Sequence, residues 1–220
     1  TVKRDIIRTY HVDASRISVC LPGIADVFLS AGEESHHPRP YFLSVGLLKP
    51  SKHLPTAIRA FAEFLKRVGK PYDFIIIGGD AGLDAEIKKT IKDLRLGKRV
   101  HLLGYVKDED VGKWYRGAEA LIALSTHEGF CLPAAEAMAC GTPVIYANQG
   151  ALPEIVGNAG IAVTSENSQT MVDAMKRLTE SALRKEKQKA AYMQSKKYRW
   201  ETFAANVLDA ITDVSAKNTA

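Results

Sequence analysis

The chain has 220 residues, 46% of them hydrophobic and 25% charged, which is the composition of an ordinary globular protein. A chain of this length forms one large domain or two small ones and can bury a core without disulfides or metals. Its net charge of +5 is modest and scattered, so it does not indicate a nucleic-acid-binding protein. No apolar run approaches the roughly 20 residues that cross a bilayer. Three cysteines without a CxxC pair argue against a disulfide scaffold and lead us to expect a reducing, cytoplasmic compartment.

Short apolar or β-branched runs alternate with amphipathic stretches along the chain. The runs predict strands at 17–20, 41–45, 73–77, 100–103, 120–124, 143–146 and 161–163. The stretches between them predict helices at 55–68, 84–94, 108–116, 134–140, 168–180 and 182–197, with a terminal helix from Arg199. Residues 30–40 are polar and predict a solvated loop. Apolar strands separated by helices indicate the α/β class, a single Rossmann-like, doubly wound parallel sheet.

The segment 125–143 carries the strongest candidate site. Pro133 suits the first turn of the helix that follows, because its missing N–H needs no partner there. The free N–H groups of that turn and the helix dipole favour a diphosphate. Glu128 in the loop and Glu136 one turn into the helix can each accept paired hydrogen bonds from vicinal hydroxyls. Glu136 alone would be an ordinary helix residue, and paired carboxylates also serve glycoside hydrolysis, but the phosphate-binding context favours a nucleotide-sugar site.

The stretch EGFCLPAAEAMACGTPVI, which contains both carboxylates, resembles the E-x7-E motif of retaining glycosyltransferases of family 4, enzymes with the two-domain GT-B fold. Further stretches resemble this family in order and spacing, at 41–61, 74–79, 100–106, 152–162 and 198–202. The resemblance implies an inter-domain lead-in segment at 1–22, a nucleotide-sugar-binding domain at 23–197 and a C-terminal helix and tail at 198–220. It also implies that the chain is the C-terminal half of an enzyme and lacks the acceptor-binding N-terminal domain.

The resemblance also implies roles for individual residues. Glu128 corresponds to the carboxylate that contacts the hydroxyls of the donor sugar, Glu136 to the ribose ligand, and Lys52 to the lysine that binds the diphosphate. Such a lysine stabilises the charge that grows on the leaving nucleoside diphosphate, so neither a metal nor another cofactor is expected. The other expected donor contacts are Gly46, the backbone of Phe130, Cys131 and Leu132, and, around the base, Gly78, Gly79, Tyr105 and Val106.

The sequence departs from the family pattern after the first strand of this domain. The family often has an arginine directly after the glycine, as a second cation for the phosphates, but here Gly46 is followed by Leu47. Lys49 either supplies the missing charge or is solvated. His53, which follows Lys52, either donates to a phosphate or only fills the turn.

Other chemistry-bearing residues are weaker candidates. His36 and His37 resemble a metal pair, but no third ligand is expected nearby, and we interpret them as part of the solvated loop. Trp114 and Tyr115 fit helix packing better than base stacking. The basic stretch 184–197 is either a solvated helix face or a surface that approaches anionic lipid.

Together with the resemblance, these observations predict a donor-binding domain, and the resemblance implies a retaining hexosyltransferase. Residues 151–154 and the Lys52-His53 pair resemble bacterial mannosyltransferases of surface-polysaccharide assembly, which makes GDP-mannose the first expected donor and a UDP-sugar the next. The expected acceptor is a saccharide or a lipid-linked saccharide, held by the missing domain, and contact with the inner face of a membrane is an extension of that expectation. The chain alone is expected to bind nucleotide and to transfer no sugar. The alternatives are a non-catalytic sugar-nucleotide-binding scaffold and a GT-B epimerase or hydrolase of UDP-sugars.

Overall fold

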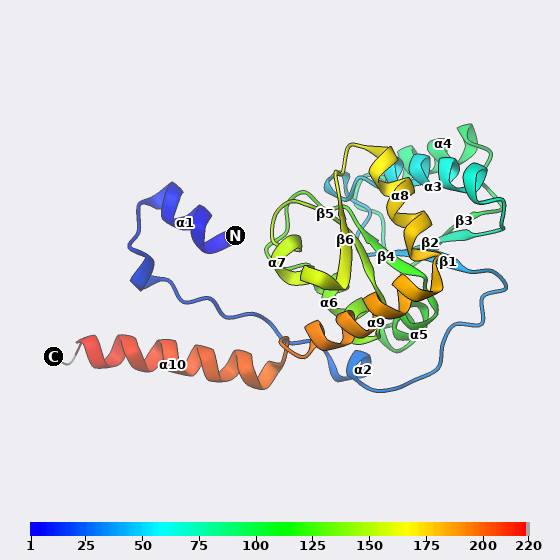
Figure 1. Ribbon diagram of the computed structural model, residues 1–220. Coiled ribbons are helices and arrows are strands. Elements are labelled where there is room, and N and C mark those ends of the chain that lie inside the picture. Colours follow the sequence, from blue (N-terminus) through cyan, green and yellow to red (C-terminus); the bar gives the residue numbers. More distant parts are fainter. Residues whose placement is uncertain (219–220) are drawn as a thin grey trace.

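A six-stranded sheet in the order β3-β2-β1-β4-β5-β6 lies at the centre of the computed structural model, which describes residues 1–218 and side chains up to residue 213 (Figure 1). Every neighbouring pair of strands is parallel. The strands are β1 (Tyr41–Val45), β2 (Asp73–Ile77), β3 (Val100–Gly104), β4 (Ala120–Ala123), β5 (Val144–Ala147) and β6 (Gly160–Val163). The predicted α/β class is therefore confirmed, and six of the predicted strands form, with ends that match the prediction or differ from it by one residue.

Helices cover both faces of the sheet, as the doubly wound prediction requires. They are α1 (Val2–Tyr10), α2 (Asp26–Leu29), α3 (Leu54–Val68), α4 (Asp84–Asp93), α5 (Asp108–Gly117), α6 (Leu132–Ala139), α7 (Leu152–Val156), α8 (Ser168–Leu178), α9 (Ser181–Ser195) and α10 (Trp200–Asn218). Successive strand residues alternate between two buried clusters: Phe42 packs with α3, α4 and α8, while Leu43 packs with α2, α5, α6 and α7. Each face of the sheet therefore has its own core.

The strand predicted at 17–20 is wrong. These residues follow a 3₁₀ turn, Ala14–Arg16, and continue in extended conformation, but among the described residues no strand pairs with them. A strand is stable only when a neighbour accepts and donates its backbone hydrogen bonds. This segment borders a pocket shared with α7, and Val19 stays 53% exposed.

The two ends of the chain lie outside the sheet-and-helix body. None of the residues of α1 is buried, and α10 extends away from the body in Figure 1, with Leu208 and Ile211 exposed. The domain boundaries after residues 22 and 197 stay a prediction, and residues 219–220 of the predicted tail lie outside the described residues. No helix in the described part of the chain is both long and apolar enough to cross a membrane.

The loop predicted at 30–40 has no regular structure apart from two bends, but it is solvated only in part. The side chain of His37 packs inward from this loop, and its Nε2 lies 2.8 Å from the carboxylate of Asp73, the first residue of β2. Asp73 is completely buried and also accepts hydrogen bonds from Arg39 at 3.2 Å and Arg99 at 3.4 Å. Burial acts to raise the pKa of Asp73, but His37 and the two arginines outweigh it, so the pKa lies below its ordinary value.

Asp73→Asn should lower the free energy of unfolding by about 1.5–3 kcal/mol at neutral pH, because it removes charge-assisted hydrogen bonds from a buried group. Since the folded pKa is depressed, this stabilisation is present above the unfolded pKa of about 3.9 and is lost as the pH falls through the folded pKa. Urea denaturation at several pH values measures both effects. An equal loss at pH 7 and at strongly acidic pH would contradict the explanation.

Candidate functional site

The predicted site residues lie in loops at the carboxyl ends of the central strands. Strand β1 pairs with β2 on one side and with β4 on the other, so the strand order reverses beside it. Ligands of open α/β sheets bind at such a reversal. The loop after β1 reaches the loop after β4, where the N–H of Thr126 donates to the carbonyl of Ser51 at 3.2 Å.

The structure brings the predicted Lys52 and Glu128 together in this place. Lys52 ends the 3₁₀ turn Pro50–Lys52, and its Nζ lies 3.1 Å from Glu128 Oε1. Both side chains are largely enclosed, with 13% and 17% of their surfaces exposed. Burial acts to raise the pKa of Glu128, but the charge and hydrogen bond of Lys52 outweigh it, and the pKa lies below its ordinary value. Glu128 is therefore a carboxylate at neutral pH, held by one cation.

Backbone donors stand beside this ion pair. Among the described residues, no protein group accepts the N–H groups of Phe130, Cys131 and Leu132, which precede or open α6. Cys131 adopts left-handed backbone with φ 78°, and Pro133 follows at the start of the helix, so the chain turns sharply into α6. Phe130 packs edge-on against Tyr198, with 5.1 Å between ring centroids, which fixes the loop from its inner side. A run of free N–H groups at a helix N-terminus is a suitable environment for phosphate oxygens.

Glu136 lies one turn into α6, and its carboxylate contacts a residue that sequence reasoning assigned to packing alone. The hydroxyl of Tyr115 donates to Glu136 Oε2 at 2.9 Å, and Tyr115 is completely buried in α5. Burial raises the pKa of Glu136 above its ordinary value, and the hydrogen bond from Tyr115 opposes that rise only in part. Tyr115 also packs edge-on against Phe28, as expected. The signal that could have found the contact is the hydroxyl itself, since a buried tyrosine needs a partner for it.

Glycines hold the turns after β1, β2 and β3 close together. The N–H of Gly46 donates to the carbonyl of Ile77, and the N–H of Gly78 donates to the carbonyl of Gly104. A Cβ added to Gly78 would lie 2.0 Å from the carbonyl oxygen of Gly46, so no side chain fits there. Beside Gly79 the space is filled by Leu47, whose Cδ2 would be 3.8 Å from an added Cβ.

The predicted base contacts are less closely tied to the rest of the site. Tyr105 is 81% exposed in the loop after β3, while Val106 packs partly against the core. Among the described residues no hydrogen bond or ion pair joins either of them to Lys52 or Glu128. Their contact with a base therefore stays a prediction.

The structure favours a charge-supplying role for Lys49 and a turn-filling role for His53, the two residues for which alternatives were left open. Lys49 is half-buried, and its charge helps to lower the pKa of Glu128 after the larger effects of burial and Lys52. It thus lies close enough to act on the site. His53 adopts left-handed backbone with φ 49° and closes the turn between Lys52 and α3, which agrees with a turn-filling role.

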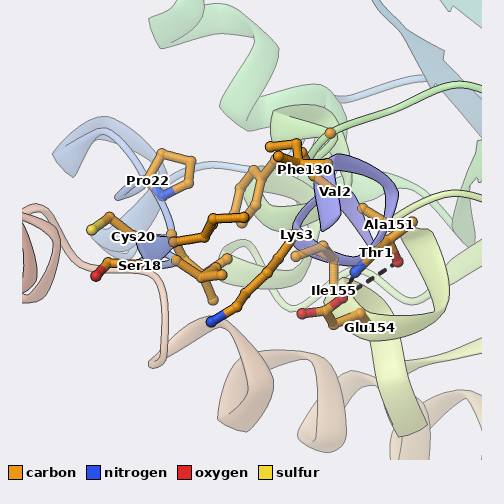
Figure 2. A pocket seen from close by; sticks show the side chains of 15 residues that line it. Thr1, Val2, Lys3, Ser18, Cys20, Pro22, Phe130, Ala151, Glu154 and Ile155 are labelled. Carbon is orange, nitrogen blue, oxygen red and sulfur yellow. Dashed lines mark hydrogen bonds and ion pairs between the residues drawn. The ribbon is translucent and has the colours of Figure 1, made fainter. Parts of the chain in front are cut away.

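A pocket lies beside the predicted donor residues and not among them. It has a volume of about 370 Å³ and is lined by the segment 17–22, the start of α1, Phe130 and α7 (Figure 2). Glu154 at its rim pairs with the amino group of Thr1 at 3.0 Å. Of the predicted donor contacts, only Phe130 lines this pocket.

The expectation that no further ligand lies near His37 is also wrong, because Asp73 and His101 lie beside it. Their ligand atoms and that of His37 all lie within 4.8 Å of one another. Arg39 and Arg99 already donate to the two oxygens of Asp73. The positive charge of these guanidinium groups disfavours a divalent cation, so we assign the cluster a structural role at the amino ends of the strands. His36 remains exposed in the loop.

A family model described as glycosyl transferases, group 1, matches residues 28–211. The chain belongs to this family. Among curated relatives, O-antigen chain mannosyltransferase RfbU of Salmonella typhimurium is 31% identical over 81% of this chain and 48% of its own length. D-inositol 3-phosphate glycosyltransferase of Acidothermus cellulolyticus is 27% identical over 99% of this chain and 52% of its own length. The chain thus spans about half the length of the curated relatives it matches.

Solved structures agree with this membership in the group 1 family. The C-terminal domain of a group 1 family glycosyl transferase from Francisella tularensis matches with a TM-score of 0.66 and 25% identity, over 78% of this chain and 95% of its own. Sucrose-phosphate synthase from Thermosynechococcus elongatus matches with a TM-score of 0.82 and 23% identity, over 99% of this chain and 57% of its own. The recognition of a GT-B glycosyltransferase domain of the C-terminal, Rossmann-like type is confirmed.

Gly78→Ala should lower the free energy of unfolding by about 3–5 kcal/mol, the sum of left-handed backbone strain and the clash with Gly46. Gly82→Ala is the matched control, because Gly82 also has positive φ, at 95°, but an added Cβ meets nothing within 4 Å. We expect the control to cost about 1–2 kcal/mol, from backbone strain alone. Thermal or urea denaturation of both variants measures the difference, and equal losses would show that the turns can separate.

Tyr115→Phe should raise the pKa of Glu136 further, because the variant removes a hydrogen bond that favours the charged carboxylate. The loss of stability should grow as the pH rises through the pKa of Glu136 and reach about 1–3 kcal/mol, because only the ionised form misses its donor. Carbon-detected NMR titration of the glutamate side chains reports the pKa directly. An unchanged titration of Glu136 would show that the contact with Tyr115 has no energetic importance.

Proposed function

We propose that this chain binds the nucleotide-activated sugar of a retaining, metal-independent hexosyltransferase. The observation that carries the proposal is the meeting of Lys52 and Glu128, 3.1 Å apart, beside the free N–H groups that open α6. A diphosphate offers anionic oxygens to both the ammonium group and the N–H groups. The group 1 family membership supports the reaction class.

In this proposal each group has a distinct part in the reaction. The ammonium group of Lys52 and the N–H groups of Phe130, Cys131 and Leu132 stabilise the negative charge that develops on the departing nucleoside diphosphate. Glu128 accepts hydrogen bonds from the hydroxyls of the sugar and fixes its orientation. Glu136 accepts hydrogen bonds from the ribose through the oxygen that Tyr115 does not occupy. The contacts of Gly46, Gly78, Gly79, Tyr105 and Val106 with donor and base belong to the same proposal.

For the donor we propose GDP-mannose first and a UDP-sugar second. A 31% identical relative named as an O-antigen chain mannosyltransferase supports the first choice. A structural neighbour solved in complex with UDP and glucose, Anabaena Alr3699/HepE, supports the second. We propose a saccharide or lipid-linked acceptor, bound by a part of the enzyme outside this chain, and a cytoplasmic site of action. Because the acceptor must be held against the anomeric carbon, this chain alone should transfer no sugar.

A non-catalytic sugar-nucleotide-binding scaffold is the second candidate, and Leu47 favours it. Leu47 is 59% exposed in the loop between β1 and Lys52, and it brings no charge to the proposed phosphate site. Lys49 is half-buried nearby and its positive charge acts on Glu128, which weakens the argument from Leu47. A GT-B epimerase or hydrolase remains separable from a transferase by analysis of the products of the full-length enzyme.

Calorimetric titration of the chain with GDP, UDP, ADP and dTDP, with and without EDTA, tests the proposal. We expect saturable binding of one nucleotide, unaffected by EDTA. Lys52→Gln and Glu136→Ala should each weaken binding by about 10- to 150-fold, because each removes a charge-assisted hydrogen bond of about 1.5–3 kcal/mol. Lys88→Gln is the matched control, since Lys88 forms an exposed ion pair with Asp84 on α4, and it should leave binding unchanged. Equal affinity in all three variants, or no binding of any nucleotide, would overturn the donor site.

A further inference from the structure

The outer surface of α9 is a cationic face without a partner in the described part of the chain. Lys185, Lys189, Tyr192 and Lys196 follow one another at spacings of four, three and four residues, which places them on one side of a helix, and all are exposed. The opposite side of α9 is buried at Ala191. Figure 1 shows α9 along the outside of the sheet-and-helix body.

The cations of α9 fall into two groups according to their partners. On the inner side, Arg184 pairs with Glu119, which precedes β4, and Lys187 donates to the carbonyl of Asn158. On the outer side the lysines are exposed and none of them forms an ion pair with a described residue. These are Lys185, Lys189, Lys196 and Lys197. Glu186 is also exposed on this face, seven residues before Met193, and Lys187 pairs with it at 3.5 Å. The outer face therefore keeps a net positive charge.

Apolar and aromatic groups lie among the outer lysines. Tyr192 is 51% exposed and Met193 is 56% exposed. Lys196 Nζ lies 4.8 Å from the centroid of the Tyr192 ring, so the ring and the ammonium group present one continuous surface. Lysines mixed with tyrosine and methionine on one helix face suit a water–membrane boundary, where the charges meet headgroups and the apolar groups enter them.

We propose that this α9 outer face, formed by Lys185, Lys189, Tyr192, Met193, Lys196 and Lys197, docks the protein on the surface of an anionic lipid bilayer. The four ammonium groups attract anionic headgroups, each strengthening binding about fivefold, and the Tyr192 ring and Met193 enter the headgroup layer. A helix of 15 residues is about 22 Å long and lies in the plane of the surface. The proposal goes beyond donor binding and does not depend on which nucleotide is bound.

Flotation of the chain with lipid vesicles tests the proposal. The probes are vesicles of phosphatidylcholine alone and of phosphatidylcholine mixed with phosphatidylglycerol. We expect flotation only with the anionic vesicles, and its loss at ~1 M salt, where the screening length falls to about 3 Å. Flotation with both kinds of vesicle alike, or with neither, overturns the proposal.

Two lysine variants of equal charge separate this face from the general basic character of the chain. The test variant is K185Q/K189Q/K196Q/K197Q. The control is K88Q/K89Q/K92Q/K98Q, which removes exposed lysines on α4 and in the segment between α4 and β3. Figure 1 shows α4 well apart from α9. We expect the test variant to bind anionic vesicles at least about a hundredfold more weakly and the control to change by less than about fivefold. Equal losses in both variants overturn the proposal.

The apolar part of the face has its own test. Tyr192→Ser with Met193→Ser keeps every charge, and we expect it to bind anionic vesicles about tenfold more weakly, because less apolar surface enters the headgroup layer. Circular dichroism of every variant checks that the helices remain. If the wild-type chain binds polyglutamate but no vesicle, the face fits an acidic protein and the lipid proposal is overturned.

Discussion

The pairing of β1 with β4 is the constraint on which the site depends. Lys52 and Glu128 are 76 residues apart in the chain, and they meet because the two strands that precede them are neighbours at the centre of the sheet. Both strands are parallel, so their following loops leave from the same edge. Gly46 and Gly78 then let neighbouring turns approach until no Cβ fits between them. The ion pair is thus a consequence of strand order and of backbone contact, with side-chain chemistry added last.

A ligand that binds Lys52 must replace the ion pair between Lys52 and Glu128. Lys52 holds Glu128, and both are largely enclosed, so each charge depends on the other. A diphosphate that takes the ammonium group leaves the carboxylate without its cation, and leaving such a group unpaired is costly. The hydroxyls of a sugar can supply the missing donors. Phosphate and sugar are therefore expected to bind together more favourably than either alone, which suits a site for an intact nucleotide-sugar.

Sequence reasoning predicted the parts of this structure that depend on local pattern. Apolar runs located six strands, and the E-x7-E stretch located Glu128 and Glu136 on their loop and helix. The strand at 17–20 failed because its apolar pattern says nothing about whether a partner strand is available. The helix predicted from residue 134 begins at Leu132, because Cys131 takes the left-handed turn that opens it.

Contacts that depend on the packing of distant elements were beyond the sequence. The hydroxyl of Tyr115 reaches Glu136 only because α5 and α6 lie side by side on one face of the sheet. In the same way His37 reaches Asp73 from a loop that its polar composition marks as solvated. In both cases a carboxylate accepts a hydrogen bond from a side chain whose residue type suggested another role. Residue type shows that a polar atom needs a partner, and only the fold shows which one it finds.

The end of α9 connects the α9 outer face with the loop before α6, here called the donor loop, which carries the free N–H groups of Phe130, Cys131 and Leu132. Tyr198 lies just after α9, is buried, and donates through its hydroxyl to the carbonyl of Ile155 in α7 at 2.7 Å. Its ring packs against Phe130, the residue that precedes Cys131 in the loop with free N–H groups. The lysines at 196 and 197 are therefore one or two residues from a side chain that holds the donor loop in place. A bilayer that binds the α9 outer face would hold this loop near the membrane surface, which agrees with the proposed lipid-linked acceptor.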